Sequence, residues 1–471
     1  MKSIYAQRHV QHCERLGVYP DSQYGSRPGR SAMDAATVKV LTFETSKVTR
    51  NALCLMDNDA VACYDRIITP ISSLACQRSG MPKPMEHLHN SILLQTKYHI
   101  KTSFGTSKQT YTSTLNSPLQ GQGQGSGNAP ACWNATSSPM WTALRHLSPL
   151  QFTTTTPDKS ITTSTQGVAF VDDAINMFNY PLQEPLPNQE QTMEHFSHLV
   201  QTWEKLLYST GGALNPDKCF WYAMLWDYDG IAPRLHNKSE LNHHILQLTN
   251  STTGSTHNIA QKDVNNATRT LGVRLSPTGN MTNELQWLTE KAGKFKLMLD
   301  RCQLRNREVF IAYTFYYLPR LTYSFPITTL SLRQCNKLQQ KITTSFLLAF
   351  GFNRNFPRSV AYGPITHGGL DFHHLYSEQG SLRIQHLIGH LRKNTTIGKM
   401  HMANLLNHQL ISGIYLPLLK HTSQELPYLD FSLLTETRNF LNEVNCTITI
   451  PAGAPETYPR DNDTHIMDHF N

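Results

Sequence analysis

The chain has 471 residues, of which 39% are hydrophobic, so it can bury a large core divided over two or three subdomains. Lys and Arg outnumber Asp and Glu, giving a formal net charge of +8, which fits a polyanionic partner without proving one. The segment from Met1 to Gly17 is polar, no apolar run approaches a membrane span, and the nine cysteines contain no Cys-x-x-Cys pair, which argues against a signal peptide, a membrane protein, a zinc knuckle and a disulfide framework.

The first predicted elements are two helices separated by a loop. Residues 4–16 and about 32–48 have helical patterns, and the loop 23–31 (Gln-Tyr-Gly-Ser-Arg-Pro-Gly-Arg-Ser) is rich in Gly and Pro. Two of its residues, Arg27 and Arg30, are candidates to meet phosphates. Locally, an exposed turn with solvated charges is the simpler interpretation.

A buried strand with acidic residues at its end comes next. Residues 52–56 form an unbroken apolar run, which predicts a buried strand. Asp57 and Asp59 follow it, a placement common among metal ligands but equally typical of a strand-ending turn. For Asp65, further on, pairing with Arg66 or capping of a following helix is the simple alternative.

A glycine-rich loop precedes the next long helix. Residues 84–99 predict a helix and residues 100–115 a hairpin. The loop 119–130 has four glycines within seven residues, so its backbone can approach another surface closely, and residues 131–147 then predict a helix. Because no Gly-Lys-Ser/Thr follows, the loop is not a P-loop, and a flexible linker is the alternative.

Residues 167–178 are the stretch around which the chain is organised. A short apolar strand, 167–170, leads to the adjacent acids Asp172 and Asp173, and a second apolar strand, 175–178, follows. The two strands predict a hairpin with both acids at its tip. Adjacent carboxylates repel each other and need a positive partner, for which a hard divalent cation is suited. An ordinary polar turn is the alternative.

The second half of the chain is mainly helical. An amphipathic helix at 193–207 and a turn containing Lys218 precede a strand at 220–224. Further elements are a polar surface insertion at 227–268, a strand at 271–275, helices at about 285–299, 309–318, 331–350 and 374–391, and a flexible end at 451–471.

Five of these segments, in this order, resemble the palm motifs of reverse transcriptases, and the best match is to the enzymes of non-LTR (LINE-like) retrotransposons. Asp59, with Tyr64 five residues on, matches the first motif, whereas Asp57 does not fit its register. Segment 121–130, Gly-x-x-Gln-Gly-x-x-x-Ala-Pro, matches the second, with Ala129 where Ser is usual.

The remaining motifs follow at sensible spacing. Segment 170–173 (Phe-Val-Asp-Asp) matches the third motif, 212–218 the fourth and 271–273 (Leu-Gly-Val) the fifth. Segment 23–27 resembles the part of the fingers before the palm, with Ser where an aromatic residue is typical. The resemblance covers about 20–276 well and continues weakly into a helical thumb. Each motif alone is weak, but five in order make coincidence improbable.

The resemblance implies an α+β fold of the right-hand polymerase type, with an antiparallel palm sheet packed on helices, partial fingers and an α-helical thumb. The domains it predicts are partial fingers at 1–50, a palm at 51–276, a thumb-like region at 277–400, and a C-terminal extension at 401–471.

The function implied is RNA-directed DNA polymerase, a nucleotidyltransferase that extends a DNA primer on an RNA template with dNTPs and two Mg²⁺ ions, or Mn²⁺. Asp59, Asp172, Asp173 and Lys218 take the catalytic roles, and the carbonyl of Ala60 joins the three acids as a metal ligand. The residues that the resemblance assigns to nucleotide or template binding are Tyr64, Gly121, Gln124, Gly125, Arg27 and Arg30.

The family normally has more fingers sequence before segment 23–27, including a basic residue that grips the triphosphate. A truncated, catalytically inactive remnant that acts at most as a nucleic-acid-binding protein is therefore the alternative, and a purely structural protein is a third possibility. We expect an intracellular protein of the nucleus or cytoplasm that is neither secreted nor bound to a membrane.

Overall fold

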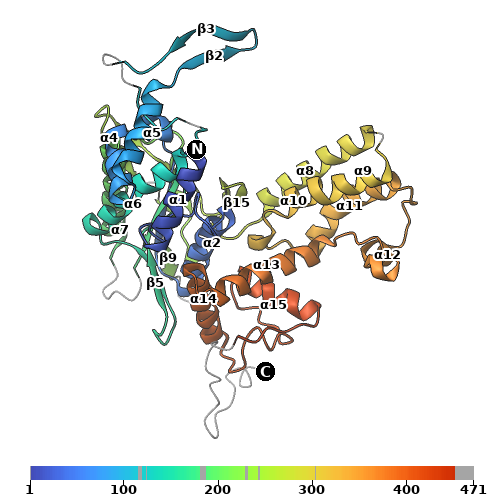
Figure 1. Ribbon diagram of the computed structural model, residues 1–471. Helices are drawn as coiled ribbons and strands as arrows, with labels where there is room; N and C mark the ends of the chain where they lie inside the picture. The colour runs from blue at the N-terminus through green and yellow to red at the C-terminus, as the bar shows by residue number, and fades with distance from the viewer. Residues whose placement is uncertain are drawn as a thin grey trace. The chain divides into compact units, whose positions relative to one another are not determined.

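The computed structural model describes residues 2–114, 119–123, 125–180, 187–228, 232–241, 244–302 and 304–450. They form two compact units with mixed α and β structure (Figure 1). The first unit comprises Met1–Ala35, Asn51–Thr153 and Ser164–Asp263, and the second comprises Ala36–Arg50, Thr154–Thr163 and Val264–Asn471. The C-terminal end expected to be flexible, 451–471, lies outside the described residues.

The first unit combines helices with a small sheet. Its helices are α1 (Lys2–Arg15), α3 (Cys63–Arg66), α4 (Thr69–Arg78), α5 (Lys83–Gln95), α6 (Ala129–Leu147), α7 (Gln189–Ser209) and the 3-10 helix η1 (Lys238–Leu241). Its strands are β1 (Leu53–Asn58), β2 (Tyr98–Thr102), β3 (Gly105–Tyr111), β6 (Gly167–Phe170), β7 (Asp173–Asn179), β8 (Phe220–Met224), β9 (Trp226–Tyr228), β10 (Pro233–Leu235), β11 (Gln247–Thr249), β12 (Thr256–Asn258) and β13 (Ala260–Gln261). Helix α2 (Ala32–Thr49), β4 (Phe152–Thr155) and β5 (Thr162–Thr165) cross the boundaries between units.

The main sheet has the order β13-β8-β1-β7-β6, with β1 in the centre. The pairs β8–β1, β1–β7 and β7–β6 are antiparallel, but β13 runs parallel to β8, with Ala260 opposite Phe220. The expected antiparallel sheet is therefore present with one parallel strand added beside β8. The long connection after β8 allows the chain to return in the same direction, so part of the segment predicted to be a surface insertion supplies an edge strand.

One face of the sheet packs against α6 and α7. Cys54 and Met56 of β1 alternate toward this core, as expected for a strand with a period of two. The apolar residues of α7 recur at helical spacing and join the same cluster, and Trp203 lies 4.5 Å from Trp141 of α6 between ring centroids. Asn188 caps the N-terminus of α7, because its side chain accepts a hydrogen bond from the Gln191 N–H at 2.8 Å.

The second unit is mainly helical. Besides most of α2 it contains β14 (Thr268–Thr270), β15 (Val273–Leu275), α8 (Thr282–Arg301), α9 (Asn306–Ile311), η2 (Ala312–Tyr317), α10 (Leu318–Thr322), η3 (Phe325–Ile327), α11 (Leu332–Ala349), α12 (Arg358–Tyr362), η4 (Ile365–His367), α13 (Leu375–Arg392), α14 (Thr396–Ser412) and α15 (Leu433–Glu443). Helices α8, α9 and α11 pack around aromatic residues. The ring centroid of Phe346 lies 4.6 Å from that of Tyr313 and 5.7 Å from that of Phe295.

Two predicted helices differ from the structure. The helix expected at 309–318 is α9, a π-helical segment η2 and α10 in succession. Pro319 in the first turn of α10 has no N–H to donate, and such a break in the hydrogen-bond ladder is a common cause of a local change in helix type. The helix expected at 84–99 ends at Gln95, where Thr96 is extended. Among the described residues, no helix is both long and apolar enough to span a membrane.

Candidate active site

Three acidic residues lie at one end of the central strands of the first unit. In the antiparallel register Asn58, the last residue of β1, pairs with Ala174, so Asp59 follows β1 where Asp173 begins β7. Asp172 lies in the turn of the β6–β7 hairpin, directly before Asp173. The C-terminal end of β1 and the tip of the β6–β7 hairpin therefore lie at the same end of the sheet's strands.

A buried polar contact holds this register. The Asn58 side-chain amide donates to Asn176 Oδ1 at 2.8 Å and to the Ala174 carbonyl at 3.2 Å. Both asparagines are buried. Because a slip of one residue would leave these groups without partners in the sheet, the contact specifies the alignment of β1 with β7.

The carboxylates are not drawn tightly together. Among the described residues, the oxygens of Asp59, Asp172 and Asp173 do not all lie within 4.8 Å of one another. Asp59 instead forms a salt bridge with Lys218, whose Nζ lies 3.3 Å from Oδ2. Repulsion between neighbouring carboxylates and attraction to the lysine account for this arrangement.

Tyr64 and Cys63 lie close enough to the hairpin tip for the charges of its carboxylates to change the pKa values of both groups. Burial raises the pKa of the Tyr64 hydroxyl, and the negative charges of Asp172 and Asp173 raise it further. The same causes, burial first, raise the pKa of the Cys63 thiol. Both groups therefore stay protonated at neutral pH, and Tyr64 keeps a neutral, half-buried ring beside the acids.

The backbone next to Asp59 is fixed by the turn that carries Lys218. Ala60 forms an antiparallel bridge with Leu214. In this bridge the Asn215 N–H donates to the Asp59 carbonyl at 2.8 Å, and the Val61 N–H donates to the Ala213 carbonyl at 2.8 Å. A bridge of this kind uses the backbone groups on either side of Ala60 and leaves its own carbonyl outside the ladder.

The Asp172–Asp173 turn is held by side chains for which the sequence indicated no such role. Gln23 binds both backbone groups of Val171: its Nε2 donates to the carbonyl at 3.1 Å, and its Oε1 accepts from the N–H at 2.9 Å. Trp133 Nε1 donates to the same carbonyl at 2.6 Å. Val171 has a positive φ of 61°, so these contacts hold a conformation that a β-branched residue rarely adopts.

Gly25 makes a close backbone contact with the same turn. A Cβ at this position would lie 2.3 Å from the Val171 backbone nitrogen. The Asn134 amide of α6 also donates to the Gly25 carbonyl at 2.9 Å. The segment predicted to be fingers-like therefore acts here as a support for the acid turn.

The glycine-rich loop contacts the region of Tyr64 through Gly121. Its N–H donates to the Ile67 carbonyl at 3.0 Å, and a Cβ on Gly121 would lie 2.5 Å from the Tyr64 carbonyl oxygen and from Asp65 Cα. Gly125 is exposed, and apart from its chain neighbours no atom of the described residues lies within 4 Å of a Cβ built there. Gln124 lies outside the described residues.

Of the two loop arginines that are candidates to meet phosphates, one has its guanidinium occupied within the fold. Arg27 is buried and donates to both carboxylate oxygens of Glu14, at 2.5 and 2.8 Å, and to the Pro20 carbonyl at 2.6 Å. Its guanidinium is used to hold the loop on α1. Arg30 pairs with Asp21 at 2.7 Å and stays partly exposed.

Cys219 is another residue that sequence reasoning missed. Its Sγ accepts a hydrogen bond from the Asp59 N–H at 3.4 Å. Burial raises the pKa of the Cys219 thiol to about 11, so it remains a neutral acceptor. Its position next to Lys218 was the available signal, but nothing in the local pattern distinguishes it from a core cysteine.

The second unit carries a separate group of cations around Trp287 on α8. Arg274 Cζ and Lys291 Nζ lie 4.0 and 3.4 Å from the centre of its ring system. Burial lowers the pKa of Lys291, and the charges of Arg274, Arg320 and Arg269 lower it further against the opposing charge of Glu284. We give the name Trp287 basic cluster to Arg274 and Lys291, which lie on the ring, together with Arg269 and Arg320, whose charges act on Lys291.

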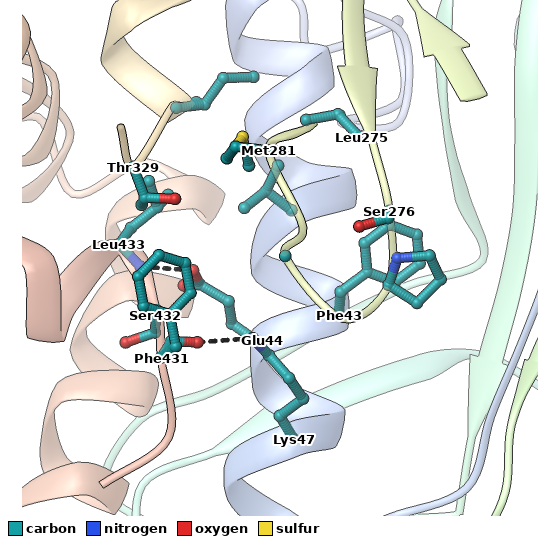
Figure 2. A pocket seen from close by; sticks show the side chains of 14 residues that line it. Phe43, Glu44, Lys47, Leu275, Ser276, Met281, Thr329, Phe431, Ser432 and Leu433 are labelled. Atoms are coloured by element: carbon teal, nitrogen blue, oxygen red, sulfur yellow. Dashed lines mark hydrogen bonds between the residues drawn. The ribbon is translucent and has the colours of Figure 1, made fainter. Parts of the chain in front are cut away.

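A small cavity in the second unit is not a substrate site. Figure 2 shows Glu44 and Lys47 of α2 beside Phe431 and Leu433. Leu433 N–H donates to Glu44 Oε1 at 2.5 Å, and Lys47 Nζ donates to the Phe431 carbonyl at 2.6 Å. The cavity measures about 20 Å³, which is room for about one water molecule.

No family model matches the chain, and no curated protein matches it. Among solved structures, similarity is found to apo telomerase from Candida tropicalis (12% identity, 86% of this chain and 56% of that one, TM-score 0.39) and to telomerase from Candida albicans in complex with a TWJ fragment of telomeric RNA (12%, 84% and 56%, TM-score 0.29). The chain spans about half the length of these structures. At these TM-scores the similarity establishes neither a common fold nor a common function.

Proposed function

We propose that the chain is an RNA-directed DNA polymerase of the non-LTR retrotransposon kind, a reverse transcriptase that extends a DNA primer on an RNA template. The proposal depends on one observation. Asp59, Asp172 and Asp173, which come from two distant segments, lie at the same end of the central strands of the sheet. Carboxylates at neighbouring positions repel one another, and a cation bound between them would remove that repulsion.

The residues present fit a hard divalent metal ion. Three carboxylates and the Ala60 carbonyl are oxygen donors of the kind that Mg²⁺ and Mn²⁺ prefer, and the salt bridge of Asp59 with Lys218 indicates that this carboxylate attracts cations. Two ions bound there would stabilise charge on the attacking and leaving oxygens of nucleotidyl transfer.

The chain's own groups then have distinct roles. Lys218 is suited to give a proton to the leaving pyrophosphate, and the neutral Tyr64 ring to pack beneath the sugar of the incoming nucleotide. The Trp287 basic cluster offers charge for the phosphate backbone of the primer and template. Arg27 takes no part, because its guanidinium is used within the fold.

Primer extension on an RNA template with dNTPs and Mg²⁺ tests the proposal. Extension by the chain and its loss in Asp172→Asn is the expected result, with Asp300→Asn on α8 as a control acid outside the site. Full extension by Asp172→Asn would contradict it.

A binding protein without catalysis is the second candidate. One observation favours it. The Trp287 basic cluster is formed by residues other than Asp59, Asp172 and Asp173, so binding of nucleic acid there would not depend on the catalytic acids. Binding of an RNA–DNA hybrid in the presence of a chelator, with no extension under any metal, would decide for this candidate.

A further inference from the structure

Among the described residues, none forms a core against the hairpin of β2 and β3. Both faces of its strands are exposed, with Tyr98 and Ser107 as the half-buried exceptions, and Phe104 near its turn is 99% exposed. Figure 1 shows it extending from the end of α5 away from α4 and α6. An isolated two-stranded hairpin is only marginally stable in water, so a surface of this kind is suited to a partner.

The charge of this region selects the kind of partner. Lys97, Lys101 and Lys108 lie in or beside the hairpin, and the sequence contains no acidic residue between Glu86 and Asp158. A ribbon with cations and no acids attracts a polyanion and repels a basic surface.

The apolar residues of the hairpin add a second requirement. Phe104 and Tyr111 expose 99% and 51% of their surface, and the Tyr111 ring stacks on Tyr98 with 5.2 Å between centroids. Exposed aromatic rings between lysines are the arrangement on which unpaired bases stack while the lysines contact phosphates. A duplex hides its bases, so it would use the lysines but not the rings.

We propose that the β2–β3 hairpin is a binding arm for single-stranded nucleic acid, in which the lysines contact phosphates and Phe104 stacks on a base. The inference rests on the proposed function, since it names a contact for the same polymer, but it needs neither the carboxylates nor a metal ion. RNA and DNA share the chemistry that the arm would recognise.

Fluorescence anisotropy of short labelled oligo(rU) and oligo(dT), with the full chain and a chelator present, tests the inference. The variants are Phe104→Ala and the combined Lys97→Gln, Lys101→Gln and Lys108→Gln, whose exposed side chains can change without disturbing a core. The matched controls are Phe315→Ala, which is 73% exposed on η2, and Lys205→Gln on α7.

The dissociation constant is expected to rise about tenfold in Phe104→Ala and about tenfold or more in the lysine variant, with a shallower dependence on salt. Equal losses for both oligonucleotides would assign the arm to any phosphodiester strand, and a loss for oligo(rU) alone would assign it to RNA. These results can occur without primer extension, so they are separate from failure of the proposed function.

Unchanged affinity in both variants, or no binding of either oligonucleotide by the wild type, would overturn the inference. Sedimentation velocity is the second measurement. A dimer that dissociates in Phe104→Ala would also overturn it, because the exposed strands would then pair with a second copy of the chain.

Discussion

Lys218 and Asp59 are joined by a salt bridge of 3.3 Å, although one follows α7 in the chain and the other follows β1. The side chain of Lys218 is 68% exposed and that of Asp59 is 33% exposed. An ion pair so open to solvent adds little to stability, at most about 1 kcal/mol. Its importance is that the ammonium occupies the surroundings of a carboxylate expected to bind a metal ion.

Lys218→Met is therefore expected to strengthen Mn²⁺ binding about fivefold, because removing one positive charge a few ångströms away relieves about 1 kcal/mol of repulsion toward the ion. Primer extension should fall in the same variant, since the proton donor is lost. Isothermal titration with Mn²⁺ measures the first effect. Unchanged or weaker Mn²⁺ binding would show that the lysine and the ion do not compete for Asp59.

Gly121→Ala is expected to lower the free energy of unfolding by about 3 kcal/mol, because a Cβ there combines a strained φ with a collision against the backbone at Tyr64 and Asp65. Gly125→Ala is the matched control: its φ is also positive, +87° against +89°, but in the part of the chain that the structure describes only its sequence neighbours lie within 4 Å of the added Cβ. Urea denaturation of both variants measures the difference. Equal losses would mean that the loop simply moves away from Tyr64.

Much of the first unit could be predicted from local patterns. Strand β8 occupies Phe220–Met224, the predicted range, because its apolar run lies between a turn and a polar segment. The β6–β7 hairpin follows from two short apolar runs around an acidic turn. Asp59, Asp172 and Asp173 lie at the same end of the central strands, as expected, while their roles as metal ligands remain a prediction.

Contacts between residues far apart in the chain could not be predicted from local sequence patterns. Strand β13 has only two residues, and its parallel position depends on Phe220 and Trp221, far from it in the chain. Gln23 contacts Val171 across 148 positions of sequence, and no periodicity marks such a contact. The pairing of Arg27 with Glu14 could not be predicted, because an arginine in a glycine-rich loop has the same local pattern whether it faces a phosphate, solvent or a carboxylate of a neighbouring helix.

Gln23→Leu is expected to lower the free energy of unfolding by about 1–3 kcal/mol, because it removes three hydrogen bonds of the Gln23 side chain, two with the Val171 backbone and one from the Gly25 N–H, and leaves these backbone groups with fewer partners. It should also weaken Mn²⁺ binding, since the turn before Asp172 is then less restrained. The control is Gln7→Leu at an exposed position of α1. Lower stability with unchanged Mn²⁺ affinity would limit Gln23 to a role in folding.

Lys291→Gln should make binding of an RNA–DNA hybrid less sensitive to salt, reducing the slope of log affinity against log salt by about one counterion. The reason is its place in the Trp287 basic cluster, 3.4 Å from the ring centre of Trp287. Lys393→Gln, at the exposed end of α13, is the control. The same slope in wild type and Lys291→Gln would exclude this lysine from the nucleic-acid surface.

Glu44 is expected to make stability depend on pH. Its buried position raises the pKa of the carboxyl group to about 7, against the opposing charge of Lys47. The unfolded chain releases this proton near the ordinary value of 4.5, and the folded chain near 7. The contribution of neutral Glu44 is therefore fully present at low pH and is lost as the pH rises from about 4.5 to 7, by about 3 kcal/mol in total.

Glu44→Gln keeps an oxygen for the Leu433 N–H but cannot ionise, so at pH 8 the variant should be more stable than the wild type by up to about 3 kcal/mol. At pH 5 the difference should be much smaller, since the folded wild type then holds its proton. Urea denaturation at both pH values measures the change, and Glu290→Gln at an exposed position of α8 controls for loss of an acid. A difference between variant and wild type that is the same at both pH values would mean that Glu44 is not the titrating group.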